Sequence, residues 1–522
     1  MTNLSRDFIH NIKRFTRIAG VADVGHNVLS LATISPSTIV FLILAVGLAL
    51  TFEFVNGFHD TANAVATVIY TNTLKATPAV VWSGLWNLIG VLISSGAVAF
   101  SVVALLPVEL VINIGSTAGF AMVFALLLSA IAWNLGTWYL GLPASSSHTL
   151  IGSIMGVGLA NSLMHGGIYS FGAGVNWEEA KQVGMALLIS PLVGFTCAAL
   201  LLLIAKALIK SPALYKAPEG KTPPPAWIRG LLVLTCTGVS FAHGSNDGQK
   251  GMGLIVLILV GILPGIYALK MDASSEVVRQ IATTALNLSG TFSRQAGEAQ
   301  PSSSEDSTKV ISTYLKTAGK LSPETYAALT QKAQEIASAL KNVKSFEDLR
   351  EDQRADLRTD FYLVSSAIKK LNKTGQLDDL TLKAEVGFSQ NVDRLTNYIP
   401  VWVKYAVALS LGLGTMIGYK RIVVTVGEKI GKSHLTYAQG GSAELVAMGT
   451  ILAADHLGLP VSTTHVLSSG IAGTMAANGS GLQKETLRNI LLAWVLTLPV
   501  CIFLGALLFA LGLNVLFSLG IR

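Results

Sequence analysis

An eight-residue motif occurs twice in this chain, and each copy lies between two apolar segments. Residues 141–148 are Gly-Leu-Pro-Ala-Ser-Ser-Ser-His, and residues 458–465 are Gly-Leu-Pro-Val-Ser-Thr-Thr-His. Glycine and proline end one helix, proline suits the first turn of the next, and the hydroxyls can cap its first N–H groups. A helix that begins inside a membrane presents unpaired N–H groups and a positive dipole end. The two copies therefore predict two half-helices that face one shared anion from opposite sides.

The apolar segments around the motifs are typical of a membrane protein. Of the 522 residues, 51% are hydrophobic and 13% are charged, a composition outside the range of globular domains. Many apolar runs exceed the ~18 residues that indicate a membrane span. The three cysteines form no zinc or disulfide pattern, so we expect no resident cofactor. The net charge of +7 fits membrane topology better than nucleic-acid binding.

The order of segments predicts an internal repeat. A span interrupted by polar residues, a second span, a hairpin around the motif and a third span occur in that order twice. Three crossings per half invert the second half, which is the architecture of secondary transporters. We therefore predict an all-α polytopic membrane protein, an inverted-repeat transporter with two broken helices, two re-entrant hairpins and a soluble helical insertion. The expected regions are 1–36 (polar N-terminal segment), 37–209 (first repeat), 210–229 (basic cytoplasmic linker), 230–271 and 399–522 (second repeat, in two parts) and 272–398 (insertion).

Two basic loops predict the orientation of the chain. Residues 206–229 and 419–434 are separated by two crossings, and both are rich in lysine and arginine. The positive-inside rule places both loops in the cytoplasm. The insertion and both termini then lie on the extracytoplasmic side of the membrane, although the basic N-terminal segment fits that rule poorly.

The two interrupted spans carry matching carboxylates. Aligned, residues 57–63 and 244–250 place Asp60 opposite Asp247. A carboxylate inside a membrane must bind a cation or a proton, or pair with a base. Two of them at equivalent positions of a repeat predict that they hold the driving ion beside an anionic substrate.

Lys250 and His59 indicate whether the driving ion is a proton or sodium. Lys250 occupies the position equivalent to Asn63, and its ammonium can stand where another transporter keeps a metal cation. His59 can titrate near neutral pH. Together they favour protons over sodium. The alternatives are that Lys250 extends to the membrane surface and that His59 only forms a hydrogen bond.

The motifs together resemble those of the PiT family of inorganic phosphate transporters. Asp60 with Asn63, and Asn246 with Asp247, resemble that family's doubled Gly-x-Asn-Asp signature. Residues 458–465 match its Gly-Leu-Pro-x-Ser-Thr-Thr-His motif, and 141–148 match it with serine for threonine. The strings Gly-Phe-His-Asp-Thr-Ala-Asn and Asn-Asp-Gly-Gln-Lys-Gly, and a hydrophilic insertion, are most similar to the bacterial low-affinity phosphate permease branch.

This resemblance implies a symporter that imports inorganic phosphate by alternating access around a midplane site. In the similar branch protons are the coupled ion, and phosphate travels partly as a neutral complex with a divalent metal. It also implies a multi-pass protein of the bacterial inner membrane, surrounded by lipid; a homodimer is compatible with the sequence. The implied phosphate ligands are Ser145, Ser146, Ser147, Ser462, Thr463, Thr464, Asn63 and Asn246. Asp60 and Asp247 would hold the coupling ion, including any metal or sodium ion, and His59, Lys250 and Glu444 would act with them.

Other functions fit the sequence less well. A sodium-coupled phosphate symporter or a sulphate permease would use the same scaffold, and Glu444 could simply brace its neighbours. An intramembrane phosphatase lacks the ligand spacing of known metal sites. The string at 427–433 has three residues between its glycines where a nucleotide-binding loop has four. We therefore expect a transporter and not an enzyme.

Overall fold

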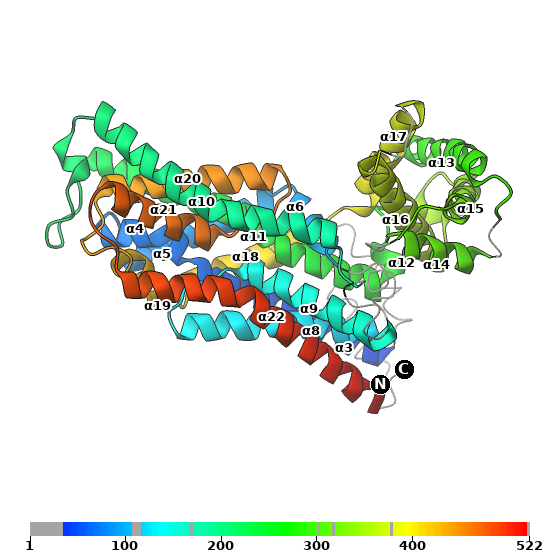
Figure 1. The fold of residues 1–522 in the computed structure, drawn as a ribbon, viewed down its shortest axis with the longest axis horizontal. Coiled ribbons are helices and arrows are strands. Elements are labelled where there is room, and N and C mark those ends of the chain that lie inside the picture. The colour runs from blue at the N-terminus through cyan, green and yellow to red at the C-terminus, as the bar shows by residue number, and fades with distance from the viewer. Residues whose placement is uncertain are drawn as a thin grey trace, which may run out of the picture.

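The computed structural model describes residues 35–106, 116–166, 172, 174–300, 303–315, 319–375 and 379–518. Within these ranges the chain is helical, and it forms an elongated bundle with a smaller helical body at one end (Figure 1). The polar N-terminal segment lies outside the described residues, except for its last two positions. The first half of the bundle contains α3 (Pro36–Asp60), α4 (Ala62–Tyr70), α5 (Ala76–Ile93), α6 (Ala97–Val103), α8 (Thr117–Tyr139), α9 (Ser146–Gly166) and α10 (Trp177–Leu208).

The second half follows a linker that holds a short 3-10 helix, η2 (Pro212–Tyr215). It is interrupted by the insertion, after which it resumes beside the first half. The basic loop expected at 419–434 contains a helix of nine residues, α19. The helices of this half are α11 (Ala226–Ile262), α12 (Pro264–Tyr267), α18 (Val401–Met416), α19 (Lys420–Glu428), α20 (Tyr437–His456), α21 (Thr463–Ala477) and α22 (Lys484–Ser518).

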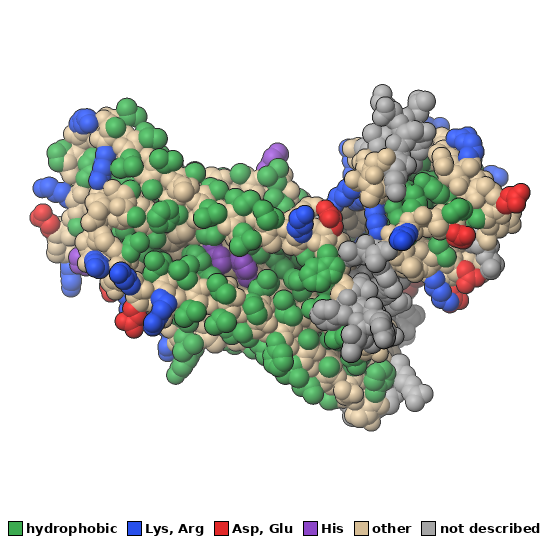
Figure 2. Space-filling view, in the orientation of Figure 1, with side chains coloured by type: hydrophobic (Ala, Val, Ile, Leu, Met, Phe, Trp, Pro, Cys, Tyr) green, Lys and Arg blue, Asp and Glu red, His purple; other side chains and the backbone are tan. Residues whose placement is uncertain are grey.

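The surface of the bundle matches a membrane environment. Six helices in the described ranges are long and apolar enough to cross a membrane. Hydrophobic side chains cover the middle of the bundle, whereas charged side chains gather at the end opposite the insertion and on the insertion itself (Figure 2). The chain is therefore a multi-pass membrane protein. The start of α3 and the end of α22 lie at the end of the bundle nearest the insertion (Figure 1).

The expected break in the second polar span is wrong. Helix α11 continues without interruption through residues 242–251. Its glycines allow close helix packing: a Cβ on Gly244 would lie 2.1 Å from the carbonyl oxygen of Asn87 on α5. The polar side chains find partners on other helices, so the backbone ladder need not open to satisfy them.

The break in the first polar span is only one residue long. Thr61 separates α3 from α4, but its φ of −51° and ψ of −36° are helical. Its N–H still donates to the carbonyl oxygen of Gly57 at 3.1 Å. Gly57 again permits close contact, because a Cβ there would lie 2.3 Å from the carbonyl oxygen of Leu411 on α18. The glycines of both stretches therefore allow close helix packing, and the chain stays close to helical through each of them.

The two repeated motifs form the turns that the sequence predicted. Helices α8 and α20 end just before Gly141 and Gly458, and both glycines have a φ of +68°, which favours residues without a Cβ. The Ser145 hydroxyl accepts from the N–H of His148 at 3.2 Å, and the Ser462 hydroxyl accepts from the N–H of His465 at 3.1 Å. The prolines lie within the turns and not in the first turns of α9 and α21.

Each half of the chain supplies the helix that covers the hairpin of the other half. Helix α22 packs along α9, and α10 packs along α21. Glycines make both contacts close: a Cβ on Gly156 would lie 2.1 Å from the Ile502 carbonyl oxygen, and one on Gly473 would lie 2.1 Å from that of Phe195. Each hairpin is therefore packed against a long helix from the other half of the chain, and the two contacts are equivalent.

The insertion has a hydrophobic core of its own. Ser322 caps α15. Arg358 Nη1 joins both ends of the insertion by donating to the carbonyl oxygens of Ala268 (2.5 Å) and Thr396 (3.2 Å). Burial raises the pKa of Asp360 to about 6, although Lys332, 2.8 Å away, opposes that shift. The helices are α13 (Ser275–Ala296), α14 (Ser304–Leu315), α15 (Pro323–Leu340), η3 (Phe346–Asp348), α16 (Glu351–Lys373) and α17 (Asp379–Thr396).

Adding one methyl group at Gly244 is expected to destabilise the bundle. Gly244→Ala forces α11 away from α5, and overpacking of this kind costs about 1–3 kcal/mol. Gly47→Ala on α3 is the matched control, because a Cβ there meets no atom within 4 Å. Thermal unfolding of both purified variants in detergent measures the difference. An unfolding temperature of Gly244→Ala equal to that of Gly47→Ala would contradict this close packing.

Candidate functional site

The two matched carboxylates lie close together in the bundle. Asp60 is at the end of α3, and Asp247 is in the middle of α11. The hydroxyl of Ser146, at the start of α9, lies 3.2 Å from Asp60 Oδ2 and 3.4 Å from Asp247 Oδ2. One hydroxyl proton can serve only one of these carboxylates at a time. Ser146 therefore links the first hairpin to both acids.

Lys250 completes this part of the site. Its Nζ lies 2.8 Å from Asp247 Oδ1 and 3.5 Å from Ser146 Oγ. The side chain is fully buried, so it does not extend to the membrane surface as one interpretation of the sequence allowed. Because a buried ammonium needs compensation, the pair with Asp247 is what allows a lysine here.

The second hairpin approaches Asp60 from the opposite side. The Thr464 hydroxyl donates to Asp60 Oδ1 at 2.5 Å. Asn63 Nδ2 lies 3.3 Å from the same oxygen, 3.3 Å from Thr463 Oγ1 and 3.0 Å from Thr464 Oγ1. Both repeated motifs thus place the first turn of a helix against the carboxylate. The positive ends of α9 and α21 favour a negative charge at this place.

Two histidines lie beside the acids, and sequence reasoning assigned only one of them to the site. His59 Nδ1 is 3.5 Å from Asp60 Oδ1, and His59 Nε2 is 3.1 Å from the Thr137 hydroxyl. His243 Nε2 lies between the acids, 3.7 Å from Asp60 Oδ2 and 3.4 Å from Asp247 Oδ2. The four-residue spacing between His243 and Asp247, one helical turn, is the signal that could have identified it. One ligand atom each from Asp60, His243 and Asp247 lie within 4.8 Å of one another.

The other expected phosphate ligands hold the hairpins in place. The Ser147 hydroxyl donates to the carbonyl oxygen of Val461 at 2.7 Å, which ties one motif to the other. Asn246 Nδ2 donates to the carbonyl oxygen of Leu459 at 3.2 Å. Ser145 and Ser462 use their oxygens as helix caps, which leaves their hydroxyl protons able to donate. All the residues expected at the site are buried, none with more than 2% of its surface exposed.

Equivalent contacts join the hairpins to the polar spans within each half. Asp455 at the end of α20 accepts from Ser245 Oγ (2.6 Å) and Gln249 Nε2 (2.5 Å) of α11. At the matching place in the other half, Trp138 at the end of α8 packs edge-on against Phe58, with ring centroids 5.0 Å apart. The contact is thus polar in the second half and aromatic in the first.

Residues 56–505 of this chain match the model of the phosphate transporter family. The chain belongs to this family. It is similar to the low-affinity inorganic phosphate transporters PitB and PitA of Escherichia coli K12, with identities of 40% and 41%. Each alignment covers 91% of this chain and 97% of the relative. A probable low-affinity inorganic phosphate transporter of Bacillus subtilis is 27% identical, over 92% of this chain and 99% of the relative.

A solved structure shares the fold of this member of the phosphate transporter family. It is described as the sodium-dependent phosphate transporter, and it superposes with a TM-score of 0.50 at 19% identity. The superposition covers 90% of this chain and 98% of that one.

Glu444 lies apart from Asp60 and Asp247. It is fully buried on α20 and accepts from the hydroxyls of Thr67 on α4 and Thr235 on α11. No hydrogen bond or ion pair of the described residues joins it to Asp60 or Asp247. Its contacts match the bracing interpretation, and its role in coupling stays a prediction.

The two histidines that end the motifs lie against each other between the hairpins. The His148 and His465 rings have centroids 4.7 Å apart, and His465 stacks on Trp494 of α22 at 4.0 Å. Trp494 Nε1 donates to the carbonyl oxygen of Pro143 at 2.9 Å. The aromatic group therefore holds both turns against α22.

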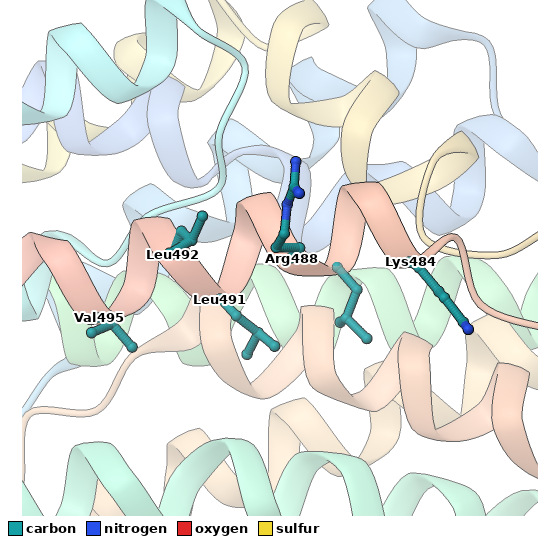
Figure 3. A pocket seen from close by; sticks show the side chains of 6 residues that line it. Lys484, Arg488, Leu491, Leu492 and Val495 are labelled. Atoms are coloured by element: carbon teal, nitrogen blue, oxygen red, sulfur yellow. The ribbon is translucent and has the colours of Figure 1, made fainter.

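A groove on the outer face of α22 is separate from this site. It has a volume of about 400 Å³, and all its lining side chains come from one helix (Figure 3). None of the residues discussed above lines it. The groove belongs to the surface of the bundle; its lining residues are Lys484, Leu487, Arg488, Leu491, Leu492 and Val495.

Proposed function

We propose that this chain is a secondary active symporter that imports inorganic phosphate together with protons. The observation that carries the proposal is the buried Lys250–Asp247 pair, 2.8 Å apart, beside the hydroxyl that bridges the two acids. A resident ammonium supplies a positive charge where a sodium-coupled site would need a metal cation. Membership of the phosphate transporter family and the names of the relatives support phosphate as the substrate. The same evidence favours a transporter over an enzyme.

Protonation of the acids would prepare the site for the anion. A carboxyl group that binds a proton gains a donor and loses charge, so it competes less for donors. The hydroxyls of Ser146 and Thr464 would then be released to donate to phosphate oxygens. The removed negative charge would also end the repulsion between Asp60 and the substrate. Phosphate and protons would thus bind best together, which is the requirement for symport.

Alternating access would open one of these two hairpin contacts at a time. Separation of Asp455 from Ser245 would expose the site on the side of the insertion, and separation of Trp138 from Phe58 would expose it on the other side. Inverted repeats support such exchange between equivalent arrangements. A polar contact can be replaced by water when it opens, whereas the aromatic contact must expose apolar surface.

The distribution of charge suggests the orientation. We place the linker and α19 in the cytoplasm and the insertion, with both termini, outside the bacterial inner membrane. Part of the phosphate would enter as a neutral metal complex. The ligand atoms of Asp60, His243 and Asp247, within 4.8 Å of one another, suit a divalent cation that accompanies the substrate.

Uptake of radiolabelled phosphate into proteoliposomes tests this proposal. We expect a proton gradient to drive accumulation, a sodium gradient to have no effect, and excess sulphate not to compete. Accumulation driven by sodium would show that Lys250 does not replace a metal cation. Strong competition by sulphate would instead assign the chain a different anion on the same scaffold.

A further inference from the structure

Glu53 is a buried acid that the mechanism above does not use. It lies on α3, two turns before Asp60, and it is fully buried. Its Oε2 is 3.5 Å from Asn56 Nδ2, at the limit of a hydrogen bond, and its Oε1 lies against the backbone of Gly251 without a hydrogen bond of normal geometry. A carboxylate buried with only such weak donors is costly, and a bound proton removes much of that cost.

The side chain lies directly against α11. Glu53 packs on Gly251, where a Cβ would lie 2.3 Å from Glu53 Cγ and 2.5 Å from Oε1. Gly251 follows Lys250, and the charges of Lys250 and Asp247 act on Glu53. Only a residue without a side chain lets the carboxyl approach α11 this closely. The position of Glu53 is therefore specific to the segment that carries the ion pair.

Few other ionisable groups lie on the helices around Glu53. Helix α3 packs against α4, α8, α11 and α18. Helices α4 and α8 carry only Tyr70 and Tyr139 as ionisable groups. Helix α18 carries Tyr405 and Lys404, whose Nζ donates to the carbonyl oxygen of Ser94. Helix α11 also carries Arg229, Cys236 and His243, but Lys250 and Asp247 are its groups whose charges act on Glu53.

We propose that Glu53 is a second proton-binding residue of the symport site, linked to Asp247 through Lys250. This inference rests on the proposed function and extends it. Acidic and basic side chains alternate in a buried series, which is Glu53, Lys250, Asp247, His243, Asp60 and His59. A proton bound at one end of this series therefore alters the balance of charge along it.

The charge count explains why a second proton is needed. Three carboxylates share one ammonium, and an anionic substrate adds further negative charge. When Glu53 holds a proton, it is neutral, and the ammonium of Lys250 interacts with Asp247 and Ser146 alone. When Glu53 releases it, the ammonium is drawn towards two carboxylates. The proton on Glu53 therefore controls how firmly Lys250 holds the part of the site that contacts Ser146.

Two transport assays on the same proteoliposomes separate proton coupling from phosphate binding. Glu53→Gln keeps the shape of the side chain but cannot release a proton. We expect it to lose accumulation driven by a proton gradient by about 5- to 150-fold, the usual range for coupling between two ligand sites. Exchange of external for internal phosphate at equal pH should continue, because exchange needs no net release of protons. Glu178→Gln, at an exposed position of α10, is the matched control.

The outcomes distinguish this inference from the proposed function. Full accumulation by Glu53→Gln overturns the inference and leaves proton symport standing. Loss of exchange as well as accumulation in a folded protein also overturns it, because Glu53 then serves the anion site or the fold. Sodium-driven accumulation by the unchanged chain refutes the proposed function itself. If Glu53→Gln does not fold, Glu53→Asp keeps the carboxyl, and we expect accumulation with a shifted pH profile; an unshifted profile contradicts the inference.

Discussion

Asp60→Asn is expected to reduce proton-driven phosphate uptake by about 5- to 150-fold, the usual range for coupling between two ligand sites, because an amide cannot take up the coupled proton. Thr464 and Ser146 donate to this carboxylate, and two histidines lie within 3.7 Å of it. An asparagine keeps one acceptor oxygen but places an amide N–H₂ group among these donors, and it cannot bind a proton. The substitution thus removes one of the two acceptor oxygens and the group that would hold the coupled proton. Initial rates in proteoliposomes under a proton gradient measure the loss.

Asp272→Asn is the matched control for this prediction. Its carboxylate is 75% exposed at the start of the insertion and lies 3.6 Å from Lys270. Exposed pairs of this kind contribute little to stability, so its uptake should equal that of the unchanged chain. A folded Asp60→Asn protein with near-normal proton-driven uptake would remove Asp60 from the coupling mechanism.

Lys250→Met is expected to destabilise the protein by about 3–5 kcal/mol, because it leaves Asp247 buried without its partner. The methionine fills most of the space that the lysine side chain occupies. Adding Asp247→Asn removes the unpaired charge, so the double variant should regain much of the lost stability. Proton-driven uptake should stay low in both. Thermal unfolding in detergent, combined with uptake, gives a double-mutant cycle for the pair.

A surface lysine provides the control for the loss of charge alone. Lys484→Met changes a residue of the groove on α22, and we expect neither stability nor uptake to fall. A Lys250→Met protein as stable as Lys484→Met would mean that Asp247 is satisfied by other groups. The buried Lys250–Asp247 pair would then play no part in proton coupling.

The repeat in the sequence predicted which residues meet, because equivalent positions of two halves converge on one site. Asp60 and Asp247 meet at Ser146, and the hairpin turns lie at the predicted glycines. Sequence could not predict that α11 stays intact, because the partner of Gly244 is a carbonyl oxygen on α5, 157 residues earlier in the chain. It did not assign His243 to the transport site, although the spacing of His243 from Asp247 on one helix was a signal for it. It did not assign Glu53 either, because Glu53 becomes notable only beside Gly251 of another helix.

The exchanged packing of the hairpins has a consequence for biosynthesis. Helix α9 is covered by α22, which emerges roughly 300 residues later; at about 5–20 residues per second this delay is on the order of 15–60 s. During that time the glycine-lined face of α9 has only lipid or the insertion machinery to contact. The first half of the protein cannot reach its final packing before α22 has been synthesised. Quality control in the membrane must therefore tolerate an incomplete half-transporter on every round of synthesis.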